Sequence, residues 1–181
     1  KFAALSDAAG DMGDAAKETL KAINVRQRSL AGGGLIVSAR TTAPLATGLG
    51  NPHPVENGFA FLSPYGVPYL AGSSVKGVVR RAAEDLALSR KSQWTIPLVW
   101  TLFGFEEGSA YVSPADDGYE AINADDSVLK KWFDKIKGRL PDEAPDDPAA
   151  FVRRIAGDSK LRRSVHWQGL LRFWDAFPFA G

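Results

Sequence analysis

The fold is decided by the stretch Gly72-Ser73-Ser74-Val75-Lys76-Gly77-Val78-Val79-Arg80, in which a turn of small residues leads into a helix. Either Ser73 or Ser74 is expected to cap this helix, because a serine hydroxyl accepts a hydrogen bond from a backbone N–H of the first turn. The N–H groups that remain point toward whatever lies before the helix, and an anion suits that position. The sequence therefore predicts a phosphate-sized anion site at this junction.

Two cations lie on one side of the predicted helix. Lys76 and Arg80 are four residues apart and so share a face. The apolar residues recur at helical spacing, and we expect them to be buried on the opposite face: Val75, Val78, Val79, Ala82, Ala83 and Leu86. The basic face is then free to meet a ligand, although an ordinary solvated face has the same spacing. Arg81 and Asp85 are expected to form a surface ion pair.

Composition narrows the classes of function. The 181 residues carry a net charge of +1, so binding of nucleic acid depends on local basic clusters, and 45% hydrophobic residues are enough for a core. With no cysteine and two histidines, we expect no disulfide, no metal site and no cofactor. No apolar run approaches the ~20 residues that span a bilayer. We expect a cytoplasmic protein without a membrane partner.

Outward from the central stretch, residue patterns predict alternating elements. The N-terminal part is expected to hold a helix over 14–30, a strand over 35–41 and a hairpin with arms over 59–62 and 67–70. The central helix is expected to run to about Ser89. The C-terminal part is expected to hold helices over 94–103, 127–137 and 148–156, and a strand over 165–173.

Four stretches, called landmarks below, stand out in order along the chain. They are Thr47-Gly48-Leu49-Gly50 with His53-Pro54, the run from Gly66 to Arg80, Leu102-Phe103-Gly104, and Gly169-Leu170-Leu171-Arg172-Phe173-Trp174-Asp175-Ala176. Together they resemble the RAMP superfamily, the RNA-binding subunits of CRISPR effector complexes. The first landmark combined with the second is most similar to subunit six of the type III-B Cmr complex.

The resemblance implies an α+β, ferredoxin-like (RRM-like) RAMP fold. Its N-terminal part would occupy 1–104, a helical and acidic insertion 105–163, and a returning strand 164–181. The insertion is longer than the family pattern, so no role transfers to it. The chain also stops where the resemblance predicts a second half with a glycine-rich loop. We therefore expect an incomplete RAMP unit and a fragment of a longer chain.

The resemblance also implies a function and a site. It implies a non-catalytic subunit that binds CRISPR guide RNA beside other Cmr subunits, with no small-molecule substrate. The residues expected to contact RNA phosphates are Gly72, Ser73, Ser74, Lys76, Gly77, Arg80 and His53. For Gly72 and Gly77, close approach by RNA and close approach by a neighbouring strand are both open. Asp175 is expected at a structural strand end.

Two other functions stay open. One is a metal-independent endoribonuclease that uses His53, since histidine moves protons near neutral pH. Because no second histidine, lysine or tyrosine stands at an obviously paired spacing, a structural or stacking role for His53 is favoured. The other is a module for assembly of the complex, whose hairpin and inserted helices dock on adjacent subunits.

Overall fold

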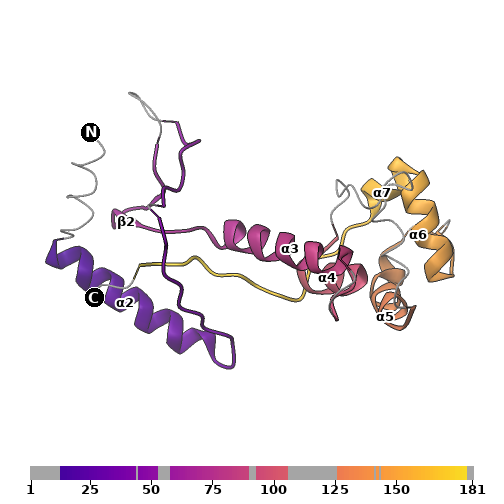
Figure 1. The fold of residues 1–181 in the computed structure, drawn as a ribbon, viewed down its shortest axis with the longest axis horizontal. Coiled ribbons are helices and arrows are strands. Elements are labelled where there is room, and N and C mark those ends of the chain that lie inside the picture. The colour runs from indigo at the N-terminus through magenta and orange to yellow at the C-terminus, as the bar shows by residue number, and fades with distance from the viewer. Residues whose placement is uncertain are drawn as a thin grey trace. The chain divides into compact units, whose positions relative to one another are not determined.

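The computed structural model describes residues 13–43, 45–52, 58–89, 93–105, 126–140, 142 and 144–178 (Figure 1). The chain forms two compact units, Lys1–Ser74 with Trp174–Gly181, and Val75–Phe173. Helices and one small antiparallel sheet make this an α+β chain. Among the described helices, none has the length and apolar character that crossing a membrane requires.

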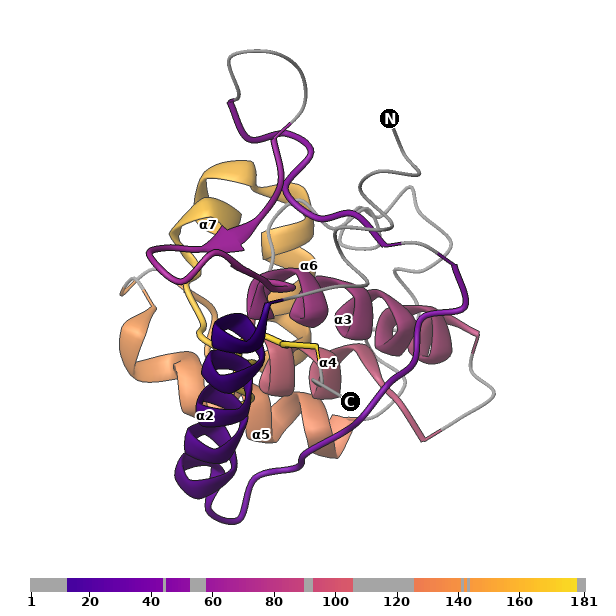
Figure 2. The ribbon, with the colours of Figure 1, turned by 90° about the vertical axis from the view of Figure 1, so that its left-hand side faces the viewer.

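The first unit contains a helix and a hairpin, as predicted. Helix α2 spans Asp14–Ala31, buries Leu20 and is followed by Gly32 at a φ of 54° (indigo in Figure 2). Strands β1 (Phe61–Leu62) and β2 (Val67–Pro68) pair antiparallel, with Leu62 opposite Val67. The hairpin is confirmed, with arms shorter than predicted.

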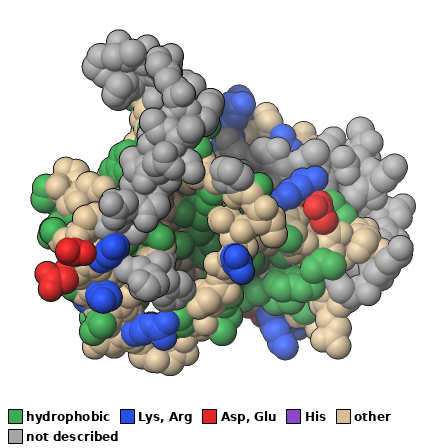
Figure 3. All heavy atoms as spheres, turned by 60° about the vertical axis from the view of Figure 1, so that its left-hand side comes forward, with side chains coloured by type: hydrophobic (Ala, Val, Ile, Leu, Met, Phe, Trp, Pro, Cys, Tyr) green, Lys and Arg blue, Asp and Glu red, His purple; other side chains and the backbone are tan. Residues whose placement is uncertain are grey.

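The strand predicted over 35–41 is wrong, because the described structure contains no ladder partner for it. Residues 35–41 have the composition of a strand, but a strand exists only where a neighbour accepts and donates its backbone hydrogen bonds. Leu35, Ile36 and Val37 are 91%, 49% and 72% exposed. Apolar side chains also reach the surface on the face drawn in Figure 3.

The second unit is helical. Its helices are α3 (Gly72–Leu88, which begins in the first unit), α4 (Ile96–Phe103), α5 (Asp126–Ile136), the 3-10 turn η3 (Lys137–Arg139), α6 (Pro148–Gly157) and α7 (Ser159–Ser164). Side chains of Thr95, Asp147 and Asp158 cap α4, α6 and α7. Each cap satisfies a backbone N–H that the helix itself leaves unpaired. These helices are confirmed except α7, which the sequence patterns did not predict.

One aromatic core holds the second unit together. Trp100 of α4 lies 4.7 Å, between ring centroids, from Trp132 of α5, and Trp132 lies 6.2 Å from Phe151 of α6. All three side chains are fully buried. The boundary that the resemblance implies between 104 and 105 crosses this core, since α4 lies before it and α5 and α6 after it. That division stays a prediction.

The segment after α7 meets the end of α4. Backbone N–H groups of Leu170 and Leu171 donate to the carbonyls of Thr101 and Leu102, at 3.1 and 2.9 Å. Gly104 and Gln168 form an isolated antiparallel bridge. Residues 165–173 therefore run beside α4 instead of forming the predicted strand, because a helix end takes the place of a strand partner. The third and fourth landmarks are joined here.

Two glycines make this contact possible. Gly104 has a φ of 100°, which side chains rarely allow. A Cβ on Gly169 would lie less than 3.0 Å from backbone atoms of Leu102, Phe103 and Gly104. A side chain at either position would push the segment away from α4.

We expect Gly169→Ala to lower the free energy of unfolding by about 1–3 kcal/mol, because backbone cannot move aside as a flexible side chain can. Urea unfolding measures the loss. Gly138→Ala is the matched control, since a Cβ there meets nothing within 4 Å in the described structure. Equal stability of the two variants would contradict the contact.

Candidate nucleic-acid interface

The N-terminus of α3 is occupied by a carboxylate of the chain itself. The N–H of Gly72, the first residue of α3, donates to Oδ1 of Asp175 at 2.8 Å. Because a helix N-terminus carries partial positive charge, the carboxylate is stabilised there. The sequence predicted a phosphate-sized anion at this junction, and at Gly72 the structure has the side chain of Asp175 there instead.

The predicted serine cap is corrected by the same contact. The helix already begins at Gly72, so Ser73 and Ser74 lie in its first turn, and both are exposed. The N–H of Ser74 donates to the carbonyl of Ala71 at 2.9 Å. The serine hydroxyls therefore stand on the surface of the helix.

Asp175 is held in place by two elements of the first unit. Leu70 and Ala176 exchange backbone hydrogen bonds of 2.9 and 2.8 Å, which fix the chain on one side of the carboxylate. Nε2 of Gln27, in α2, donates to the carbonyl of Asp175 at 2.9 Å. The second and fourth landmarks thus meet. Sequence patterns could not pair Gly72 with a partner 103 residues away.

Helix α3 buries a different face from the predicted one. Ala83, Glu84 and Ala87 are buried, whereas Val78, Val79 and Leu86 are 72%, 42% and 44% exposed. The predicted apolar face is therefore wrong except for buried Ala83 and half-buried Val75. The physical reason is packing, because the small side chains of Ala83 and Ala87 join the core that α4 and α5 build.

Arg80 is on the buried side of α3. Its Nε lies 2.9 Å from Oε1 of Glu84, and the two side chains are 11% and 8% exposed. The expectation that Arg80 stands on a free basic face is corrected by this ion pair. Lys76, one turn earlier, is half-buried. Arg81 and Asp85 form the predicted surface pair, with Nε 3.3 Å from Oδ1.

What α3 exposes near its start is a face of small residues. Gly77 follows Ser73 by four residues and Ser74 by three, so the three share one side of the helix. All three are exposed, and a Cβ on Gly77 would meet nothing within 4 Å in the described part of the chain. We call Ser73, Ser74 and Gly77, with the adjacent Lys76, the small-residue face. It contains four of the residues predicted from the sequence.

The first landmark packs on the hairpin of its own unit. Gly48 has a φ of 78°, and a Cβ there would lie less than 3.0 Å from the backbone of Phe59 and Ala60. The N–H of Ala60 donates to the carbonyl of Thr47, and Oγ1 of Thr47 donates to the carbonyl of Tyr69, at 2.8 and 2.9 Å. His53 lies outside the described residues. Its predicted role in RNA contact is untested.

The described residues hold no cluster of three or more His, Cys, Asp or Glu side chains that could bind a metal ion. His166 is exposed. Asp175, which was predicted to lie at a structural strand end, instead accepts a hydrogen bond from the first residue of α3, since the predicted strand is not formed.

We expect Asp175→Ala to lower the free energy of unfolding by about 1–2 kcal/mol, because Gly72 then loses a charged acceptor. Asp175→Asn is the matched control, since its amide oxygen still accepts the hydrogen bond, and it should retain more than half of that stability. Urea unfolding measures both. An alanine variant as stable as the wild type would refute the cap.

Comparison with known proteins adds the family. The model of the RAMP superfamily matches residues 38–181. No curated protein and no solved structure matched the chain. The match includes all four landmarks and both glycine contacts described above. RAMP proteins are CRISPR-associated and act with RNA and other subunits in effector complexes. The chain therefore belongs to the RAMP superfamily.

Proposed function

We propose that this chain is a non-catalytic subunit of a type III-B CRISPR effector, similar to Cmr subunit six, that grips guide RNA in the cytoplasm beside other subunits. The observation that carries the proposal is the exposed small-residue face at the start of α3, inside the family match. The first-landmark loop and the second landmark support the resemblance to this subunit. The ferredoxin-like fold remains part of the proposal.

The small-residue face suits a nucleic-acid backbone. Without a side chain at Gly77, a phosphate or ribose can approach the helix closely. The hydroxyls of Ser73 and Ser74 donate and accept hydrogen bonds, as recognition of phosphate oxygens and 2′-hydroxyls requires. Lys76 supplies a positive charge that attracts the phosphates. Because a guide varies in sequence, such contacts to its backbone serve every guide alike.

Arg80 has a different place in this proposal. Its ion pair with Glu84 is made within α3, on the side of the helix that carries the buried Ala83 and Ala87, so its guanidinium is already engaged. Removing one member of a largely buried ion pair destabilises a protein, which would confound a binding experiment. Lys76 and Gly77 are therefore the informative positions.

We expect Lys76→Ala to weaken RNA binding equally for unrelated sequences and to reduce the slope of log K against log salt by ~0.7. Gly77→Glu should abolish binding at this face, because it places a negative side chain where phosphate lies. Gly77→Ala checks the fold, since alanine in place of an exposed helical glycine adds up to ~1 kcal/mol of stability. Fluorescence anisotropy with labelled single-stranded RNA measures the affinity.

Gly138→Glu is the control for added charge at an open glycine. If the RNA affinity and its salt dependence stay unchanged in Lys76→Ala and Gly77→Glu, the proposed site is contradicted. Complex assembly without RNA affinity would favour an assembly module instead. Cleavage of repeat RNA by the wild type that His53→Ala abolishes would replace the non-catalytic proposal with an endoribonuclease.

A further inference from the structure

Residues 130–139, which hold five Lys and Arg residues and one Asp, are one strongly basic stretch of the chain, and residues 153–163 are a second. The second stretch holds five of the 22 Lys and Arg residues and one of the 21 Asp and Glu residues: Arg153, Arg154, Lys160, Arg162 and Arg163 against Asp158. The rest of the chain has 17 cations and 20 acids, a net charge of −3. A nearly neutral chain therefore contains two strongly basic stretches, of which we call 153–163 the basic segment, and local clusters of this kind attract polyanions.

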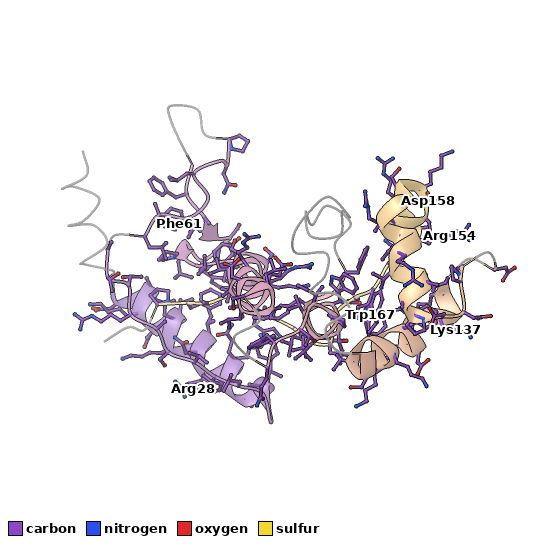
Figure 4. The ribbon with its side chains drawn as sticks, turned by 45° about the vertical axis from the view of Figure 1, so that its right-hand side comes forward. Arg28, Phe61, Lys137, Arg154, Asp158 and Trp167 are labelled. Carbon is purple, nitrogen blue, oxygen red and sulfur yellow. The ribbon has the colours of Figure 1, made fainter. Side chains whose placement is uncertain are left out.

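The basic segment folds into the corner between α6 and α7. Asp158 is the one residue between the two helices. Its N–H donates to the carbonyl of Arg154 at 2.8 Å, and its carbonyl accepts from the N–H of Arg162 at 3.0 Å. Figure 4 shows Arg154 and Asp158 at this corner, with nitrogen-tipped side chains pointing outward around them. Cations of the last turns of α6 and of α7 thus come to one end of the helix pair.

Two charged side chains hold the corner together. Oδ1 of Asp158 accepts from the N–H groups of Leu161 and Lys160, at 3.1 and 2.9 Å, and these bonds lower the pKa of the carboxyl. Nη1 of Arg162 donates to the carbonyl of Ala156 at 3.3 Å. The single carboxylate of the corner is thereby committed to capping α7, and it offsets one positive charge of five.

The remaining cations face solvent. Arg153, Arg154, Lys160 and Arg163 are exposed. Nη2 of Arg153 lies 4.0 Å from Oδ2 of Asp147, and both side chains are 64% exposed, so this pair contributes little. In the described part of the chain, no carboxylate lies within 4.0 Å of the charged nitrogens of Lys160 or Arg163. We call Arg153, Lys160 and Arg163 the corner surface.

We propose that the corner surface binds the phosphate backbone of RNA and provides a second contact, distinct from the small-residue face. This inference rests on the proposed function, since it assumes that the chain meets RNA. It assigns a role to the 105–163 region, to which the family resemblance transfers none. Arginine suits the task, because its planar guanidinium matches two phosphate oxygens.

The chemistry of the corner favours RNA over a protein partner. Stable protein interfaces have a core of apolar and aromatic side chains that binding buries. The exposed residues between 153 and 166 are all polar, charged or glycine: Arg153, Arg154, Gly157, Ser159, Lys160, Arg163, Ser164 and His166. A surface of this kind gains affinity from charge neutralisation and release of counterions, as binding to a nucleic-acid backbone does.

The test is anisotropy of labelled single-stranded RNA with the 181-residue chain over a range of salt concentrations. The corner variant combines Arg153→Ala, Lys160→Ala and Arg163→Ala. We expect it to reduce affinity about tenfold or more and the salt slope by ~2, at ~0.7 per lost phosphate contact. The matched control combines Lys130→Ala, Lys131→Ala and Lys135→Ala, which removes the same charge from exposed positions of α5. It should keep most of the affinity and slope.

Each alternative outcome has a clear meaning. An unchanged corner variant, with binding still lost in Gly77→Glu, overturns the corner surface and leaves the proposed function standing. Equal losses of RNA affinity in the corner and control variants would mean that binding depends on the total positive charge of the chain, and they overturn the corner surface. A wild type that binds no RNA overturns both proposals. If the chain binds poly-glutamate as tightly as RNA, and the corner variant loses affinity for both to the same extent, RNA is overturned as the specific partner in favour of an acidic protein. Circular dichroism checks that the variants fold.

Discussion

Asp175 accepts a hydrogen bond from the first N–H of α3, and the arrangement of the first unit depends on this contact. The carboxylate fixes where the central helix begins. The backbone bridge between Leu70 and Ala176 and the bond from Gln27 join the hairpin, the C-terminal segment and α2 around it. With the N–H of Gly72 engaged in this way, the RNA contact that we propose for α3 is on its exposed side instead of at its end.

Close backbone contacts explain the glycines of the landmarks. Gly48 lies against Ala60 within the first unit, and Gly104 and Gly169 lie against each other's segments in the second. In each case a Cβ would collide with backbone, which cannot rotate away. Gly50, Gly66 and Gly77 differ, since a Cβ at each would meet nothing within 4 Å in the described part of the chain. The landmark glycines therefore divide into those that pack the chain on itself and those with open space beside them, and of the latter only Gly77 lies in a described helix.

Local patterns predicted the helices well, and non-local contacts account for the errors. The end of helix α3 was predicted to within about a residue, because spacing is a local property, whereas its start lies at Gly72, before the predicted serine cap. Its buried face was wrong, since the partners of Ala83, Ala87 and Arg80 decide that face. The strands over 35–41 and 165–173 were wrong because strand pairing requires a neighbour that composition does not reveal. Helix α7 could have been found from Asp158, a good cap before Ser159.

The candidate site shows the same division. Sequence patterns and the family resemblance selected Ser73, Ser74, Lys76 and Gly77, which the structure brings together on one side of α3. They also selected Arg80 as a free cation, which its ion pair with Glu84 contradicts. The basic corner between α6 and α7 was overlooked although its charges are plain in the sequence, because the four landmarks that guided the sequence analysis lie outside it.

Nuclear magnetic resonance of the chain labelled with nitrogen-15 at glycine, titrated with single-stranded RNA, tests the central claim most directly. The account predicts that the amide signal of Gly77 shifts progressively, while that of Gly72 stays at its position because Asp175 already holds that N–H. A shift of Gly72 without one of Gly77 would show RNA displacing the carboxylate at the helix N-terminus. That result would contradict the account.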